Sequence, residues 1–176
     1  MTRNSALKVR LTYHFQNRGS FELLEFEIQE LGLDASFESA FSLLKELNCF
    51  NVSMVFLSTT DQRDQIFGNY NLHQIVAGDY GTISQSALIK KLSFPYTNPE
   101  SKEDGYPGIE DDQLYNQRIR EIARTHLNVS SNCFELKISD QQRDKFSLSS
   151  VWEEFKNFIC IDREKNRVHL ITIGKD

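Results

Sequence analysis

The amino-acid sequence predicts an α+β fold, with a mixed, mostly antiparallel sheet of five to seven strands and three or four helices. Residues 7–28 alternate apolar and polar side chains as a β-hairpin does. Several later segments carry an apolar stripe of helical period, and the chain ends in two β-rich runs. We therefore expect the fold to open and close with β-hairpins, and 176 residues to form a single domain.

The turn of the first hairpin predicts its register. Strands are expected at 7–15 and 21–29, joined by a two-residue loop at Arg18-Gly19. That loop places Arg10 opposite Glu27 on the solvent side and Tyr13 near Leu24 in the core. Acidic side chains then offset the basic ones of the first strand. Together with the net charge of −5, this argues against nucleic-acid binding.

A helix and a strand are expected next. The helix is capped by Asp34 or Ser36, keeps its apolar residues on one face to Leu47, and ends with Asn48 in a left-handed conformation. Residues 52–57 are nearly continuously apolar, which suits a central strand.

The middle of the chain is less regular. Residues 61–71 are polar and support one or two helical turns at most, and 72–77 suit a short strand. A turn is expected at 78–81, and Thr82 is the expected cap of a helix that ends near Leu92.

All three prolines of the chain lie within residues 94–108, which predicts a long surface loop. Tyr96 and Tyr106 flank a charged stretch that includes Glu103 and Asp104. Tyrosine is favoured at protein interfaces because it buries a large area and loses little entropy. These four residues are therefore the predicted binding surface. A disordered connector is the alternative interpretation.

The longest helix is expected at 109–127, with acidic residues in its first turn and basic ones in its last, and a strand follows at 134–138. Strands are then expected at 158–161 and 168–173, and the last is apolar on both faces, so it belongs inside the sheet. A helix is expected just before them, with four side chains on its apolar face: Leu148, Val151, Trp152 and Phe155.

The cysteines predict a reducing environment. Cys49, Cys133 and Cys160 cannot all pair, and each lies beside apolar residues, so we expect buried thiols. No run is apolar and long enough to span a membrane, and the N-terminus lacks the apolar core of a signal peptide. We expect a cytoplasmic protein that does not enter the membrane.

The sequence predicts no metal or cofactor. Its four histidines, at 14, 73, 126 and 169, lie on separate expected elements without the short spacings of a local metal site. His169, on an apolar strand, is interpreted as a core histidine.

Two functions remain open. Because no polar residues converge in the sequence, we predict a non-catalytic binding or regulatory protein that contacts another protein. The alternative is a small metal-dependent enzyme acting on nucleotides or nucleic acid. Glu135 and Lys137 have the E-x-K spacing with which some nucleases hold Mg²⁺ and activate water. Asp79 is the upstream acidic residue that could complete such a site.

Overall fold

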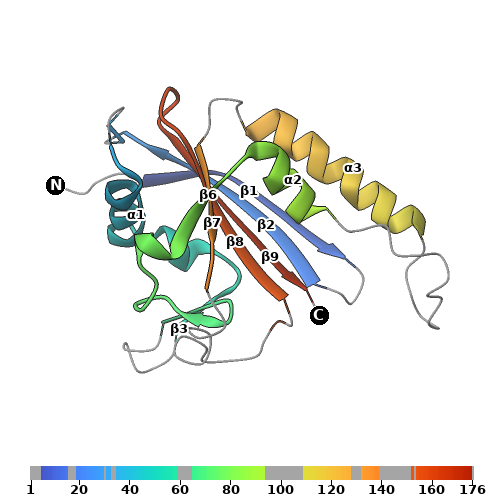
Figure 1. The fold of residues 1–176 in the computed structure, drawn as a ribbon, viewed down its shortest axis with the longest axis horizontal. Helices are drawn as coiled ribbons and strands as arrows, with labels where there is room; N and C mark the ends of the chain where they lie inside the picture. Colours follow the sequence, from blue (N-terminus) through green and yellow to red (C-terminus); the bar gives the residue numbers. More distant parts are fainter. Residues whose placement is uncertain are drawn as a thin grey trace.

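The α+β class is confirmed by the computed structural model (Figure 1), which combines two antiparallel sheets with helices. The model describes residues 5–15, 19–29, 31–32, 35–58, 65–93, 109–127, 132–138, 152 and 154–175.

The larger sheet has six described strands in the order β1-β2-β9-β8-β7-β6. In that order the strands are Ser5–Phe15, Gly19–Ile28, Arg167–Lys175, Glu154–Asp162, Asn132–Leu136 and Tyr80–Ile83. All neighbours in it are antiparallel, so the sheet is not mixed. The final strand, β9, lies between β2 and β8 as its apolar sequence predicts.

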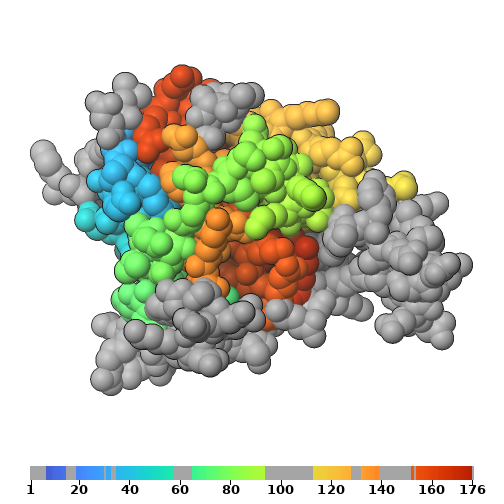
Figure 2. Space-filling model, viewed as in Figure 1, coloured from blue at the N-terminus to red at the C-terminus, as the bar shows by residue number. Residues whose placement is uncertain are grey.

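Both faces of this sheet are covered. On one face, α1 (Phe37–Glu46) packs together with a small sheet of β3 (Phe56–Ser58), β4 (Gln65–Phe67) and β5 (Tyr70–Asn71). On the other face, α2 (Gln85–Leu92) and α3 (Ile109–His126) adjoin one another, as the space-filling view shows (Figure 2). Alternate residues of β2 therefore enter two separate cores.

The helix ends follow the local sequence. Ser36 caps α1, because its Oγ accepts a hydrogen bond from the Ser39 N–H at 3.2 Å. Asn48 has a φ of 54°, as expected for the residue that ends this helix. The long helix α3 also begins at Ile109 as predicted.

The predicted register of the first hairpin is wrong. Arg10 lies opposite Leu24, and Tyr13 lies opposite Phe21. Gly19 pairs with Phe15 and so belongs to β2, not to a two-residue loop with Arg18, and a bulge between Leu7 and Val9 shifts the pairing again. Because both faces of β2 are buried, alternation of apolar and polar residues does not determine this register.

The middle of the chain also differs from the prediction. Residues 52–57 do not form a central strand, because a 3₁₀ helix spans Cys49–Val52 and β3 lies at the edge of the small sheet. In 65–71, the described part of the segment 61–71, β4 and β5 stand where helical turns were expected, and 72–77 contains no strand. Instead of a turn at 78–81, a 3₁₀ helix (Ala77–Asp79) leads into β6. Ser84, not Thr82, caps α2.

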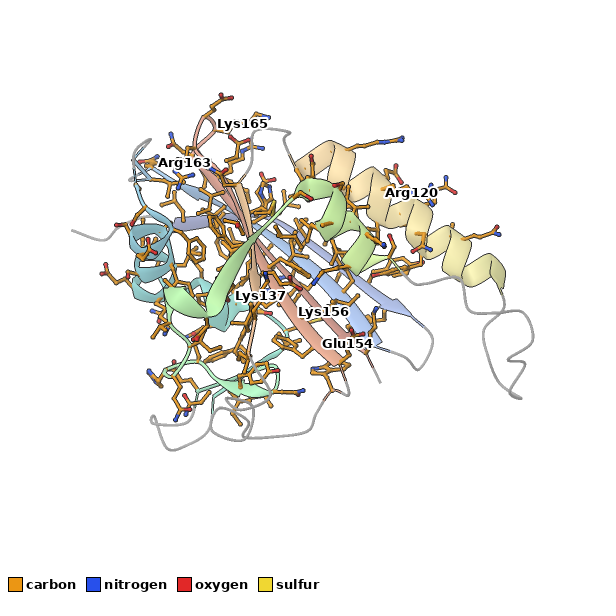
Figure 3. All side chains as sticks on the ribbon, viewed as in Figure 1. Arg120, Lys137, Glu154, Lys156, Arg163 and Lys165 are labelled. Carbon is orange, nitrogen blue, oxygen red and sulfur yellow. A yellow bond between two sulfur atoms is a disulfide. The ribbon has the colours of Figure 1, made fainter. Side chains whose placement is uncertain are left out.

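The helix expected just before the last hairpin does not extend to Phe155. Strand β8 begins at Glu154, and Trp152 is not helical. Glu154 and Lys156, two positions apart, form an ion pair on one side of the strand (Figure 3), which is the spacing of a β-strand. Leu148 and Val151 lie outside the described residues.

The cysteines correct another prediction. Cys133 and Cys160 are not separate thiols but form a disulfide between β7 and β8, where they lie directly opposite each other. Cys49 is buried elsewhere, beside α1.

None of the described helices is long and apolar enough to cross a membrane.

Candidate functional site

A groove runs between the edge strand β1 and helix α3, and we call it the β1–α3 groove. Its volume is about 520 Å³, which is within the range of small-ligand pockets. Side chains of β1 and β2 form the floor, and one side of α3 forms the wall. The lining residues are Arg10, Leu11, Thr12, Tyr13, Phe21, Arg118, Glu121, Ile122, Thr125 and His126.

The groove exists because α3 extends over the edge of the sheet. Buried residues of the helix, including Tyr115 and Ile119, join the core above β2, β8 and β9. Tyr115 reaches Tyr13 of β1, with 5.9 Å between the ring centroids. Leu11 and Tyr13 are only partly buried by this packing, so apolar surface remains at the edge.

Strand β1 is an edge strand among the described residues, with β2 on one side only. Alternate N–H and C=O groups of an edge strand point away from its neighbour and can pair with another strand. The groove thus offers main-chain hydrogen-bonding groups along one margin and side chains from α3 along the other.

His126 connects the groove to a buried charge. It lines the groove at the end of α3, and its Nδ1 lies 3.3 Å from the Oε2 of Glu25, which is 2% exposed. The Nε2 of His169 lies 3.0 Å from the same oxygen, and Arg167 lies 3.0 Å from the other carboxylate oxygen. One carboxylate therefore joins α3 to the centre of the sheet.

The electrostatics of this cluster favour an ionised Glu25. Burial alone would raise the pKa of its carboxyl, but hydrogen bonds from His126 and His169 and the charge of Arg167 lower it below the ordinary value. Burial lowers the pKa of His169, although Glu25 opposes this shift. We therefore assign His169 as neutral at pH 7, with Nε2–H donating to Glu25.

The basic residues of β1 face acidic partners, although not those predicted. Lys8 lies 3.0 Å from Glu27, and Arg10 lies 3.9 Å from the buried Glu22. Arg10 also donates to the carbonyl of Val52. The acidic neighbours reduce the basic character of this strand, so it gives no support to nucleic-acid binding.

The residues proposed for a metal-dependent enzyme lie near one another, with Asp79 in the 3₁₀ helix before β6, Glu135 in β7 and Lys137 just after β7, but the carboxylates of Asp79 and Glu135 are engaged elsewhere. The Lys137 N–H donates to the Asp79 carbonyl at 2.8 Å, so the main chains are adjacent. The Asp79 carboxylate accepts from the Val76 N–H at 2.9 Å, and Glu135 forms an ion pair with Lys91 at 2.6 Å. No group of three His, Cys, Asp or Glu side chains in the described part of the chain could hold a metal ion.

The predicted binding residues Tyr96, Tyr106, Glu103 and Asp104 lie outside the described residues. Their role stays a prediction.

The groove residues were not predicted from the sequence. One signal was present, because Lys8 and Arg10 alternate with apolar residues in the first strand, and natural edge strands often carry such charges. The Glu25–His169 pair joins residues 144 positions apart, which no local pattern identifies.

The chain matches no protein-family model, and no curated protein matches it significantly in sequence.

Proposed function

We propose that the protein is a non-catalytic binding or regulatory protein that holds an extended segment of a partner protein in the β1–α3 groove. The observation that carries this proposal is a long edge strand, β1, lying beside a helix with a groove of about 520 Å³ between them. Extended peptides bind such places by adding a strand to the sheet, with main-chain hydrogen bonds supplying affinity.

The length of the groove suits a short segment. Its β1 residues run from Arg10 to Tyr13, and its α3 residues run from Arg118 to His126. Three steps along a strand span about 10 Å, and eight steps along a helix span about 12 Å. Both margins therefore match an extended segment of about four residues.

The residues that line the groove favour a segment in which apolar and polar side chains alternate. Leu11, Phe21 and Ile122 are apolar, whereas Arg118 and His126 bring polar groups from the helix. Successive side chains of an extended segment point to opposite sides. In a segment added beside β1, alternate side chains would point into the groove toward α3, and the others would point to the opposite face of the sheet.

A substitution that fills the groove tests this proposal. Thr125 is exposed on α3 and lines the groove, so Thr125→Trp should block it without disturbing the core. Gln117 is exposed on the same helix and does not line the groove, so Gln117→Trp is the matched control. The probes are peptides selected on the wild-type protein from a random display library.

We expect the selected peptides to bind Thr125→Trp at least about tenfold more weakly, a loss of about 1.4 kcal/mol, and to bind Gln117→Trp normally. Hydrogen exchange of the outward amides of β1 should slow when peptide is bound. Peptides that bind both variants equally and leave the exchange of β1 unchanged would refute the groove as the binding site.

A further inference from the structure

A row of side chains crosses four neighbouring strands on the face that α2 and α3 cover. Cys133 of β7 lies opposite Cys160 of β8, and the two form the disulfide. Cys160 in turn lies opposite His169 of β9, and His169 lies opposite Glu25 of β2. Directly opposed residues of antiparallel strands have Cβ atoms about 4.5–5.5 Å apart. The row thus places a disulfide next to an imidazole and the imidazole next to a carboxylate.

The imidazole of His169 has one nitrogen in use and one without a partner. Nε2 binds Glu25, whereas Nδ1 is buried and has no hydrogen-bond partner among the described residues. In the neutral ring that donates through Nε2, Nδ1 is an acceptor. A buried acceptor without a donor costs free energy. A disulfide carries no hydrogen, so Cys160 cannot supply this donor while it is oxidised.

We propose that Cys133 and Cys160 form a reversible redox site, reduced by a dithiol, whose reduced form is stabilised by a hydrogen bond from the Cys160 thiol to Nδ1 of His169. In the reaction a thiolate of the dithiol attacks one sulfur, and the S–S bond breaks through a mixed disulfide. The second thiol of the reagent then releases the protein. Two electrons and two protons pass to Cys133 and Cys160, and the dithiol becomes a disulfide.

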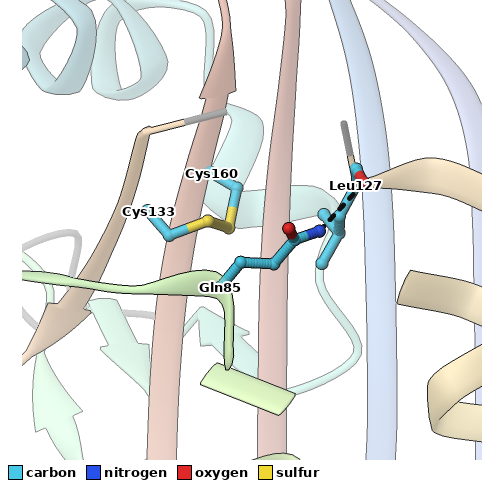
Figure 4. The surroundings of a disulfide bond; sticks show 4 residues. All are labelled: Gln85, Leu127, Cys133 and Cys160. Atoms are coloured by element: carbon cyan, nitrogen blue, oxygen red, sulfur yellow. Dashed lines mark hydrogen bonds between the residues drawn. A yellow bond between two sulfur atoms is a disulfide. The ribbon is translucent and has the colours of Figure 1, made fainter. Parts of the chain in front are cut away.

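The start of α2 lies beside the disulfide. Cys133 is 3% exposed, and Cys160 is buried. The side chain of Gln85 passes beside the disulfide and donates from Nε2 to the carbonyl of Leu127 at 3.0 Å (Figure 4). This bond joins the start of α2 to Leu127 after α3, to one side of the disulfide, so its opening should affect how fast a reductant enters.

The experiment equilibrates the folded full-length protein in mixtures of reduced and oxidised dithiothreitol, followed by acid quenching, alkylation under unfolding conditions and intact mass. The oxidised chain should take one alkyl group, and the reduced chain should take three, because the chain has three cysteines. His169→Gln keeps a donor for Glu25 but places no acceptor at Nδ1. We expect it to shift the equilibrium toward the disulfide by about tenfold, equivalent to about 30 mV.

Two control variants separate the effect of the hydrogen bond on the redox equilibrium from a general loosening of the structure. His73→Gln replaces an exposed histidine and should leave the equilibrium unchanged. Gln85→Ala should speed reduction several-fold while leaving the equilibrium within about twofold of wild type. If His169→Gln does not fold, the ¹⁵N shift of His169 Nδ1 in the wild-type protein should change between the two redox states.

Three results would overturn the proposal. The first is a folded protein that stays fully oxidised in excess dithiothreitol, as a permanent structural disulfide would. The second is a protein in which Cys133 and Cys160 never form the disulfide in these mixtures. The third is a His169→Gln equilibrium, or a wild-type Nδ1 shift, that does not change.

Discussion

At the scale of single residues, Glu25 determines the electrostatics of the sheet interior. Its carboxylate accepts from His126 and His169 and forms an ion pair with Arg167, so three elements meet at one buried charge. A buried carboxylate is retained only where such partners compensate for the water it loses. The same arrangement keeps His169 neutral, because burial outweighs the attraction of Glu25.

Stability should therefore fall as pH decreases below neutrality. The pKa of His169 in the folded state lies below its ordinary value of 6.5, so from about pH 7 downward the unfolded chain binds a proton that the folded chain does not. The loss can reach at most about 1.4 kcal/mol per pH unit for one proton. Glu25, whose folded pKa is lowered from 4.5, contributes a similar loss only at more acidic pH.

Urea unfolding of the oxidised protein at several pH values between 7 and 5.5 measures this dependence. His169→Gln should reduce the slope of unfolding free energy against pH, and His73→Gln should not. Glu25, His126, Arg167 and Asp162 also surround this ring, so the difference in slope between the variants, and not the slope of one protein alone, reports on His169. Equal slopes in the two variants would show that His169 is not the group responsible.

At the scale of elements, α1 and α3 could be predicted, whereas the strand register and the helix expected up to Phe155 could not. Caps are local, so Ser36 and Asn48 mark the ends of α1 in the sequence itself. The register of two strands cannot be predicted from their local sequence when both faces of the sheet are buried. Glu22 and Glu25 are both buried in β2, Glu22 against Ser53 and Glu25 against His169, so neither marks a solvent face.

The same limit explains what was missed at the candidate site. The groove depends on α3 lying over β1, elements that are about 100 residues apart in the chain, as the contact between Tyr13 and Tyr115 illustrates. Composition led to the prediction of Tyr96 and Tyr106, because prolines gather near them, whereas no composition signal indicates that a helix lies beside the edge strand.

The close approach of two C-terminal segments gives a prediction at this scale. A Cβ on Gly174 of β9 would overlap the indole of Trp152, so only glycine fits. Gly174→Ala should destabilise the protein by about 1–3 kcal/mol, the usual cost of overpacking. Gly78→Ala is the matched control, since its Cβ meets nothing within 4 Å and its φ is not positive. Thermal unfolding measures both, and two equal melting temperatures would contradict the contact.

At the scale of the whole molecule, the fold has two separate cores on the two faces of one sheet. The β1–α3 groove belongs to the face that α2 and α3 cover, and the disulfide and Glu25 lie on that same face. The other face carries the small sheet and α1. Binding at the groove and reduction of the disulfide would therefore act on one layer of the molecule, and the opposite core would hold the sheet in place.

Residues 94–108, where the sequence predicts a loop, directly precede α3, the helix that forms one wall of the groove. We predict that Tyr96 and Tyr106 add a second contact to a full-length partner but not to a short peptide held in the groove. Truncating interface tyrosines often costs more than about 1 kcal/mol of binding free energy, whereas surface substitutions usually change stability by less than about 0.5 kcal/mol. Tyr96→Ala with Tyr106→Ala should therefore leave the melting temperature nearly unchanged.

The measurement compares two ligands for the same double variant. A library-selected peptide should bind it as it binds the wild type, because the peptide occupies only the groove. A partner protein that carries that peptide sequence within a folded domain should bind the double variant about fivefold or more weakly, and Thr125→Trp should weaken both ligands. If the partner protein also binds the double variant normally, the loop is a connector and the groove alone accounts for recognition.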